Sequence, residues 1–264
     1  MTIWNKIQGK VSRSSPATRY PRRIYKLALV RKTHGLSFPK AMEARILSSF
    51  LADSVKGKRM LDVACGFGEY TVQISKAGHC QVCGMDISEG AIKMAHYCGG
   101  ARCYFLLADA ANMPFQSNIF DAVLCACSLE HFANDEAALE EMSRVLKKDG
   151  TLALSVDSFS YQGVTQHIKE THTRRFSVVR YYSFVSLKEK LQRAGFEIEK
   201  QKYFFNSPIS SFLLCQYIKT GKVLLFRLLY PLLYTFSVLS DRWLGRKKEG
   251  YFLAVKAKKI SNRL

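Results

Sequence analysis

Apolar residues recur along this chain with two alternating periods. Several short apolar runs have the length and composition of buried strands, and the segments between them repeat apolar residues at helical spacings. The predicted strands are 58–64, 81–87, 101–107, 119–127, 151–156, 196–204 and 251–256. The predicted helices are 41–51, 70–76, 89–97, 135–147, and one that opens with the capping-box pattern Ser186–Glu189 and closes at Gly195. Strands that alternate with helices predict an α/β fold with a parallel sheet and right-handed crossovers.

The strand pattern is interrupted near the end of the chain. We expect residues 42–204 and 249–264 to form one α/β domain, with residues 205–248 inserted before its last strand. Residues 1–41 precede that domain and form an expected basic N-terminal cap. A chain of 264 residues suits one large domain with insertions and is short for two full domains.

The insertion 205–248 is mostly apolar. Its longer apolar run, 223–240, has 18 residues and includes Arg227 and Pro231, whereas a membrane-spanning helix needs about 20 apolar residues. A single crossing is excluded if both flanking strands belong to one sheet, because the chain must return to the side that it left. We therefore expect helices that form a lid over a pocket, an in-plane membrane anchor, a re-entrant hairpin turning at 219–222, or a dimer interface.

Charge is distributed unevenly along the chain. The net charge is +19; residues 1–42 hold 10 Lys or Arg and no acid, and residues 201–264 hold 12 against two acids. Residues 43–200 hold 18 basic and 19 acidic residues, a net charge of −1. Either the ends only add solubility, or they face an anionic partner such as lipid headgroups, a phosphorylated substrate or RNA.

The cysteines and the first residues of the chain bear on its compartment. The N-terminal MTIWNKIQGK has no apolar signal-peptide core, so we expect a cytoplasmic protein whose eight cysteines are reduced. Cys80 and Cys83 follow His79 with the spacing of half a zinc site, but no second close pair follows. We therefore expect structural thiols and no metal site.

The strongest functional signal is the segment LDVACGFGE at 61–69. It predicts a buried strand that turns sharply into a helix, with Gly66 and Gly68 allowing the backbone to approach a ligand. Two acids close the next strands: Asp86 lies 18 residues beyond Gly68, and Asp109 follows the third strand. A carboxylate at Asp86 can accept from both hydroxyls of a ribose, and Asp109 can accept from an adenine amino group.

Two other nucleotide-binding motifs fail to match this loop. A dinucleotide fingerprint needs G-x-G-x-x-G, and Thr71 occupies the position of the third glycine. No P-loop string, G-x-x-x-x-G-K-[ST], occurs in the chain. Dinucleotide and P-loop ligands are therefore disfavoured.

Five strings of this sequence resemble a known family. They are LDVACGFGEYT, GMDIS, ADAANMPFQSNIFDAVLC, SLEHFANDEAALEEMSRVLKKDGTLALSV and LQRAGFEI. On these residues the chain resembles the class I S-adenosylmethionine-dependent methyltransferases, in the small-molecule methyltransferase group that includes quinone C-methylases. The resemblance implies a Rossmann-like, mostly parallel sheet with helices on both faces and an antiparallel last strand. It also implies S-adenosyl-L-methionine as the cofactor.

The resemblance implies roles at nine matching positions. These are Asp62, Ala64, Gly66, Gly68, Asp86, Met85, Ile87, Asp109 and Ala110. The first four would hold the methionine part of the cofactor, and Asp86 would hold its ribose. Met85 and Ile87 would pack on the adenine, and the last two would face its edge. Ala64 departs from the motif, which often has glycine there.

A proton acceptor is expected just past the fourth predicted strand. His131 lies there, and a histidine side chain titrates near neutral pH, as removal of a proton from an oxygen nucleophile requires. The alternative is a structural role or a role on the cofactor side for His131. Members of the family that the chain resembles often have Glu-His at this position although they methylate different acceptors. Weaker candidates after the fifth strand are His167, His172, Tyr181 and Tyr182.

Together these features predict methyl transfer to oxygen or carbon of a small, amphiphilic or lipid-linked acceptor. The protein would be cytoplasmic and peripheral at the inner face of an anionic membrane. One rival is an RNA methyltransferase, although no RNA-binding module or basic–aromatic motif occurs. The other rival is a non-catalytic scaffold that keeps the cofactor fold, although the intact cofactor positions argue against it. The sequence specifies no oligomeric state.

Overall fold

A seven-stranded sheet forms the centre of the computed structural model, which describes residues 37–78, 80–220, 226 and 228–260. The strands are β1 (Arg59–Val63), β2 (Gln81–Asp86), β3 (Cys103–Leu107), β4 (Phe120–Ala126), β5 (Leu146–Asp157), β6 (Phe196–Phe204) and β7 (Phe252–Lys259). Their order is β3-β2-β1-β4-β5-β7-β6. The strands β1 to β5 pair in parallel, and β7 lies antiparallel between β5 and β6. The predicted Rossmann-like sheet with an antiparallel last strand is therefore confirmed.

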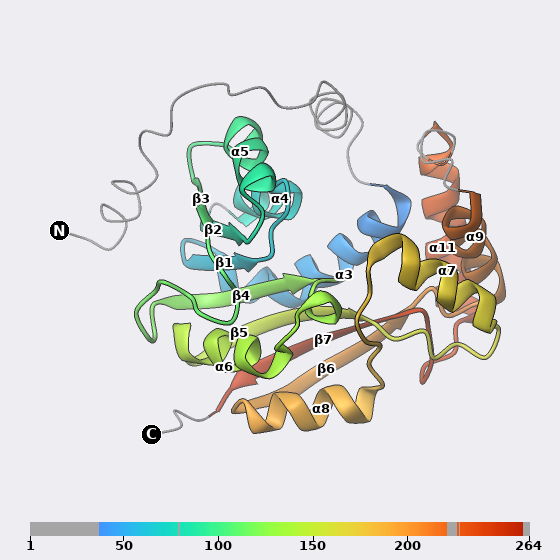
Figure 1. Cartoon of the computed structure of the whole chain (residues 1–264). Helices are drawn as coiled ribbons and strands as arrows, with labels where there is room; N and C mark the ends of the chain where they lie inside the picture. The colour runs from blue at the N-terminus through green and yellow to red at the C-terminus, as the bar shows by residue number, and fades with distance from the viewer. Residues whose placement is uncertain (1–36, 79, 221–225, 227, 261–264) are drawn as a thin grey trace.

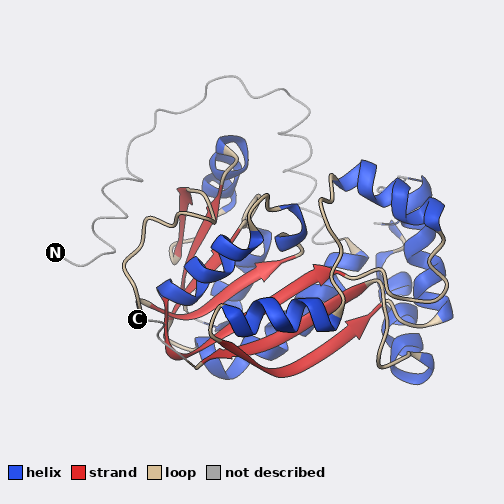
Figure 2. Cartoon of the chain, turned by 60° about the horizontal axis from the view of Figure 1, so that its bottom comes forward, coloured by secondary structure: helices blue, strands red, loops and turns tan. Residues whose placement is uncertain are grey.

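Helices cover both faces of the sheet (Figures 1 and 2). They are α3 (Phe38–Val55), α4 (Glu69–Gly78), α5 (Glu89–Cys98), the short η1 (Leu129–His131), α6 (Asp135–Val145), α7 (Gln166–Phe176), α8 (Phe184–Arg193), α9 (Pro208–Thr220) and α11 (Tyr230–Leu244). Successive residues of β4 pack on opposite faces of the sheet, because side chains along a strand point alternately to the two sides. Val123 packs in the core with α6 and α8, and Leu124 packs in the core with α3, α4 and α9.

Among the predicted helix boundaries that differ from the structure, two are wrong for identifiable local reasons. The helix expected over 135–147 ends at Val145, because the carbonyl of Val145 accepts from Ile119 N–H at 2.9 Å and β5 begins at once. The helix expected to open at Ser186 begins at Phe184 instead. Its capping box joins Ser183 and Ser186, which exchange backbone and side-chain hydrogen bonds at 3.1 Å.

The residues of the expected insertion form α9 and α11. Both helices lie at one end of the sheet beside α7 (Figure 1), and α11 also packs against α3. Within the described residues, no helix combines the length and the apolar character needed to cross a membrane. The expected N-terminal cap lies almost wholly outside the described residues, which include only its last few positions before and within α3.

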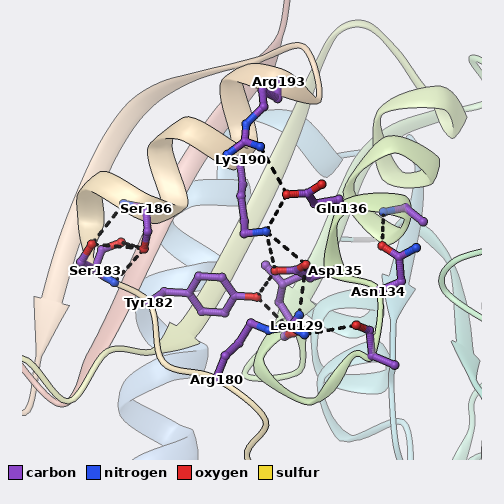
Figure 3. A network of polar contacts seen from close by, with 12 residues as sticks. Leu129, Asn134, Asp135, Glu136, Arg180, Tyr182, Ser183, Ser186, Lys190 and Arg193 are labelled. Carbon is purple, nitrogen blue, oxygen red and sulfur yellow. Dashed lines mark hydrogen bonds and ion pairs between the residues drawn. The ribbon is translucent and has the colours of Figure 1, made fainter.

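A network of polar contacts fixes η1 and the start of α6 against α8 (Figure 3). Asp135 lies at its centre, accepting from the Tyr182 hydroxyl at 2.6 Å and pairing with Arg180 at 3.0 Å and Lys190 at 3.2 Å. Tyr182 also donates to the Leu129 carbonyl at 3.4 Å. Burial opposes ionisation of Asp135, yet hydrogen bonds from Tyr182 and Lys190 hold its pKa below the usual range. The network therefore keeps η1 in one place relative to α6 and α8.

Candidate functional site

The loop between β1 and α4 has the backbone shape that its glycines predict. Ala64, Gly66 and Gly68 adopt positive φ angles of 56°, 55° and 76°. A Cβ added to Gly66 would meet nothing within 4 Å, so open space lies beside this residue. A Cβ added to Gly68 would lie 2.7 Å from the Phe105 ring, which leaves room for glycine alone. The loop is therefore tightly packed at one glycine and open at the other.

Ala64 carries a conformational strain that glycine would remove. A left-handed φ disfavours residues with a Cβ by about 1–2 kcal/mol, and glycine adds freedom to the unfolded chain that offsets part of this. We expect Ala64→Gly to raise the free energy of unfolding by about 0.5–1 kcal/mol in urea denaturation. Ala52→Gly, at an exposed position of α3, should lower it by a similar amount. A less stable Ala64→Gly protein would mean that the methyl group contributes packing instead of strain.

Two strand-end carboxylates lie at the same edge of the sheet as this loop. Gly66 N–H donates to Asp86 Oδ2 at 2.8 Å, which ties the loop to the end of β2. Ala108 N–H donates to the Asp86 carbonyl at 3.0 Å, which ties β2 to the segment after β3. Asp109 follows and is exposed, with Ala110 partly buried beside it. Three separate parts of the sequence are thus joined by hydrogen bonds into one surface.

The side chains around Asp86 fit a nucleoside-bearing ligand. Ile87 is 74% exposed and Leu107 is 50% exposed, so two large apolar groups face solvent at this edge. Met85 is only 1% exposed and packs in the core, where its carbonyl accepts from Cys65 N–H at 2.9 Å. Any contribution of Met85 to a ligand site is therefore confined to its backbone. Open space at the loop, a carboxylate and exposed apolar groups match a sugar and a base.

Asp62 lies beneath the loop. Its side chain is buried and accepts a hydrogen bond from the Thr71 hydroxyl at 2.5 Å. Burial raises the pKa of Asp62 to about 7, against the lowering effect of the Thr71 hydrogen bond. The enclosed carboxyl group therefore links β1 to α4 and supports the loop from below.

A cavity of about 190 Å³ lies where β4 and β5 end. Its apolar lining consists of Pro39, Phe176, Phe204, Leu214, Tyr217, Ile218 and Phe252. Its polar lining consists of Ser37, Lys40, Glu43, Cys127, Glu130, His131, Asp157 and His172. Lys40 forms an ion pair at 3.1 Å with Glu69, the residue after Gly68. The cavity is thus the neighbour of the glycine loop and has both an apolar and a polar part.

Three buried carboxyl groups share the polar part of the cavity. Glu43 accepts from the Tyr70 hydroxyl at 2.5 Å and from the Ser155 hydroxyl. Glu130 Oε1 accepts from Asp157 N–H at 3.3 Å. Glu130 Oε2 is buried and has no hydrogen-bond partner among the described residues. This oxygen is therefore available to a ligand in the cavity.

Burial shifts the pKa values of Glu130, Asp157 and His172 toward their uncharged forms. Burial, reinforced by neighbouring acids, raises the pKa of both Glu130 and Asp157. His172 Nδ1 lies 3.6 Å from Asp157 Oδ2, but burial lowers the pKa of His172 to about 3, so the imidazole is uncharged at neutral pH and this contact is not an ion pair. Ligand atoms of Cys127, Glu130 and Asp157 all lie within 4.8 Å of one another. The cluster can surround a polar group and exchange hydrogen bonds or a proton with it.

His131 lies at the same cavity, at the end of η1. Its Nδ1 is 3.2 Å from the Ser177 carbonyl oxygen. Because a carbonyl only accepts, Nδ1 carries a proton in this contact, and in the neutral ring the lone pair is then on Nε2. Of the weaker candidates, His172 lines the cavity and Tyr181 contacts His172 at 3.2 Å. His167 is exposed, and Tyr182 belongs to the network around Asp135.

Glu43, Cys127 and Asp157 are among the cavity residues that sequence reasoning missed. Asp157 ends the fifth strand, so the strand-end rule that identified Asp86 could have found it. Glu43 lies three residues before Ile46 on the buried face of α3, and an acid on an apolar helix face is a usable signal. Cys127 ends the predicted strand 119–127, so the strand-end rule could have found it, although its place at the cavity also depends on the turn after β4.

The cysteine pair singled out by its spacing lies in the core. Cys80 and Cys83 are both buried, and Cys80 Sγ donates to the Ile74 carbonyl at 3.8 Å. Burial raises the pKa of both thiols. The two side chains therefore act as small apolar groups, and no disulfide joins any of the eight cysteines, all of which are described.

Known proteins share this fold and sequence pattern. A family described as "Methyltransferase domain" matches residues 61–154. An O-methyltransferase of Aspergillus nomiae is 31% identical over 151 residues, covering 55% of this chain and 67% of its own. A demethylmenaquinone methyltransferase of Staphylococcus saprophyticus is 32% identical over 168 residues, covering 57% of this chain and 69% of its own. Several other demethylmenaquinone methyltransferases are matched over less than half of their length, for example 43% in Corynebacterium kroppenstedtii.

Solved structures agree at the level of the fold. Geranyl diphosphate C-methyltransferase from Streptomyces coelicolor, with Mg²⁺, geranyl diphosphate and S-adenosyl-L-homocysteine, has a TM-score of 0.62 at 14% identity, covering 83% of this chain and 77% of that one. A phosphoethanolamine N-methyltransferase of Haemonchus contortus, with S-adenosylhomocysteine, has a TM-score of 0.60 at 20% identity, covering 82% and 53%. Together with the glycine loop and the strand-end carboxylates, these matches show that the chain belongs to the class I S-adenosylmethionine-dependent methyltransferases, with S-adenosylmethionine as its cofactor.

Proposed function

We propose that this enzyme methylates an oxygen or carbon atom of a small, amphiphilic or lipid-linked acceptor at an anionic membrane surface. The observation that carries the proposal is the mixed lining of the cavity beside the glycine loop. Its apolar part, which includes Phe204 and Phe252, suits a hydrocarbon portion, and its buried carboxyl groups suit a polar end. Relatives named for demethylmenaquinone and a structural neighbour that holds geranyl diphosphate support an acceptor of this kind.

The proposed cofactor contacts begin at the glycine loop. Asp62, Ala64, Gly66 and Gly68 would surround the methionine part, with Asp62 acting through the loop that it supports. The open space beside Gly66 and the positive φ angles support this placement.

The nucleoside contacts would come from the ends of β2 and β3. Asp86 would accept from the ribose hydroxyls, and exposed Ile87 would pack on the adenine above the buried Met85. Asp109 and Ala110 would face the adenine edge. The hydrogen bond from Gly66 to Asp86 supports this arrangement, because it places the loop and the carboxylate within one site.

Bound S-adenosylmethionine supplies a methyl group already activated by the sulfonium charge. The protein therefore has to align the acceptor and remove its proton. We assign proton removal to His131, whose Nδ1 is held by the Ser177 carbonyl and whose Nε2 keeps a lone pair. Asp157, Glu130 and His172 would hold the polar end of the acceptor.

The test is to incubate cell extracts with the enzyme and isotopically methyl-labelled S-adenosylmethionine, followed by mass spectrometry. We expect label in an amphiphilic product of the lipid extract. The Asp86→Ala protein, with its impaired cofactor site, serves as the matched control. Label confined to RNA would overturn the proposal in favour of an RNA methyltransferase.

A further inference from the structure

The helix α11 turns several of its large apolar side chains toward solvent, while others pack partly buried against the protein. Leu232 is 59% exposed, Phe236 is 58% exposed and Trp243 is 77% exposed, and Leu239 lies between the last two. Their spacing of four, three and four residues places them on one side of a helix. Of the 16 large hydrophobic side chains exposed in the described residues, nine lie between 209 and 244. The exposed apolar surface is therefore concentrated on this part of the molecule.

The inward side of α11 includes small polar residues. Ser237 and Ser240 are buried, and Ser240 Oγ lies 2.8 Å from Ser207 Oγ at the start of α9. Ser237 Oγ is buried without a hydrogen-bond partner among the described residues. A helix facing water normally directs its most apolar side to the core and its polar side outward. The partial inversion in α11 indicates that its outer side meets an apolar phase.

The end of α11 is cationic. Arg242, Lys247 and Lys248 are exposed, and Arg242 lies 5.9 Å from the Trp243 ring. The nearby acids are engaged: Asp241 accepts from Phe205 N–H at 2.7 Å, and Glu249 pairs with Arg246 at 2.6 Å. The surface thus combines an apolar stripe with unneutralised positive charge, which complements anionic headgroups.

We propose that α11 lies in the plane of an anionic lipid membrane. The stripe of Leu232, Phe236, Leu239 and Trp243 enters the boundary between headgroups and acyl chains, and the cations at its end contact the headgroups. A helix of 15 residues is about 22 Å long, which suits an in-plane position and falls short of a crossing. A second copy of the chain is a poorer partner, because it would bring the same cations to this surface.

This docking would bring the cavity close to the bilayer. The helix α11 packs against α9, and α9 contributes Leu214, Tyr217 and Ile218 to the cavity lining. Figures 1 and 2 show these two helices grouped with α7 beyond one end of the sheet. On the proposed function, an acceptor carried in the membrane would enter beside α9. This last step rests on that function, whereas the docking itself does not.

The test is flotation of the full chain with vesicles of phosphatidylcholine alone or mixed with phosphatidylglycerol. We expect binding to the anionic vesicles that weakens at high salt. Replacing Leu232, Phe236, Leu239 and Trp243 together by serine should lower the bound fraction at least tenfold, as should Arg242→Gln with Lys247→Gln and Lys248→Gln. Val185→Ser, which changes an exposed apolar residue of α8, is the matched control and should float as the wild type does.

Folding is checked by thermal unfolding and by S-adenosylmethionine binding, which the four-serine variant should retain because these side chains lie on the surface. Absence of wild-type binding to anionic vesicles would overturn the proposal. So would a folded four-serine variant that floats as well as the wild type. A dimer that the same variant dissociates, with no vesicle binding, would replace the membrane by a second copy. Since flotation needs no acceptor, its result is independent of the methyl-transfer test.

Discussion

Replacing His131 with asparagine should slow methyl transfer by about 10²–10⁴-fold, the range that a positioned general base contributes. Asparagine can still donate to the Ser177 carbonyl that His131 Nδ1 contacts at 3.2 Å, but it has no ring nitrogen to take the acceptor proton. The rate is measured as label incorporated into the acceptor fraction at saturating S-adenosylmethionine. Binding of S-adenosylmethionine, measured by calorimetry, should change less than threefold.

Two controls separate catalysis from structure in this experiment. His96→Asn changes an exposed histidine of α5, outside the cavity, and should leave the rate unchanged. Tyr182→Phe removes one hydrogen bond to Asp135 in the network that holds η1, and so reports how far the rate depends on the position of that turn. A His131→Asn rate within threefold of the wild type would exclude His131 as the base. Asp157, whose pKa burial raises, would then be the next group to test.

The sheet and the glycine loop could be predicted from the sequence because their signals are local. Each strand is a short apolar run, and the turn from β1 to α4 needs positive φ at Gly66 and Gly68, which glycine adopts most readily. The strand-end rule then gave Asp86 and Asp109 without any knowledge of contacts. Even so, the hydrogen bond between Gly66 and Asp86 could not be predicted, because it depends on the register of β1 and β2.

The sequence could not predict that the polar groups of the cavity meet in one place, because they come from distant elements. Glu43 lies in α3, Glu130 in η1, Asp157 at the end of β5 and His172 in α7. The resemblance identified functional positions at the strand ends, but it did not predict which helices contribute side chains to the cavity beside them. An acid at a strand end or on an apolar helix face can be noted from the sequence, but whether it is buried at a cavity depends on packing.

The predictions of helix ends, and of which side of a helix faces the protein, failed for related reasons. Ser183 and Ser186 are three residues apart and cap the helix reciprocally, so the helix start predicted from the pattern at Ser186 was three residues too late. The apolar run at 223–240 indicated a helix, but its period alone does not say which side faces the protein. The structure directs Ser237 inward and Phe236 outward, and this choice follows from the contacts of α11 with α9 and α3.

Replacing Asp86 with alanine should weaken S-adenosylmethionine binding tenfold or more. A hydrogen bond to a charged group contributes roughly 1.5–3 kcal/mol, and 1.4 kcal/mol corresponds to a factor of ten in the dissociation constant. The carboxylate also accepts from Gly66 N–H at 2.8 Å and from Ser88 N–H at 2.9 Å, so alanine loosens the glycine loop as well. Calorimetry with S-adenosylmethionine and S-adenosylhomocysteine should show the same loss, because both carry the ribose.

The conservative variant separates these two contributions. Asp86→Asn keeps an oxygen that can accept from Gly66 N–H but lacks the charge and the second acceptor for a ribose, so we expect its affinity between those of the wild type and Asp86→Ala. Asp53→Ala, at an exposed carboxylate of α3, controls for the change in net charge and should bind as the wild type does. Unchanged affinity in a folded Asp86→Ala protein would remove Asp86 from the cofactor site. The loop at Gly66 would then have to hold the cofactor without a ribose partner on β2.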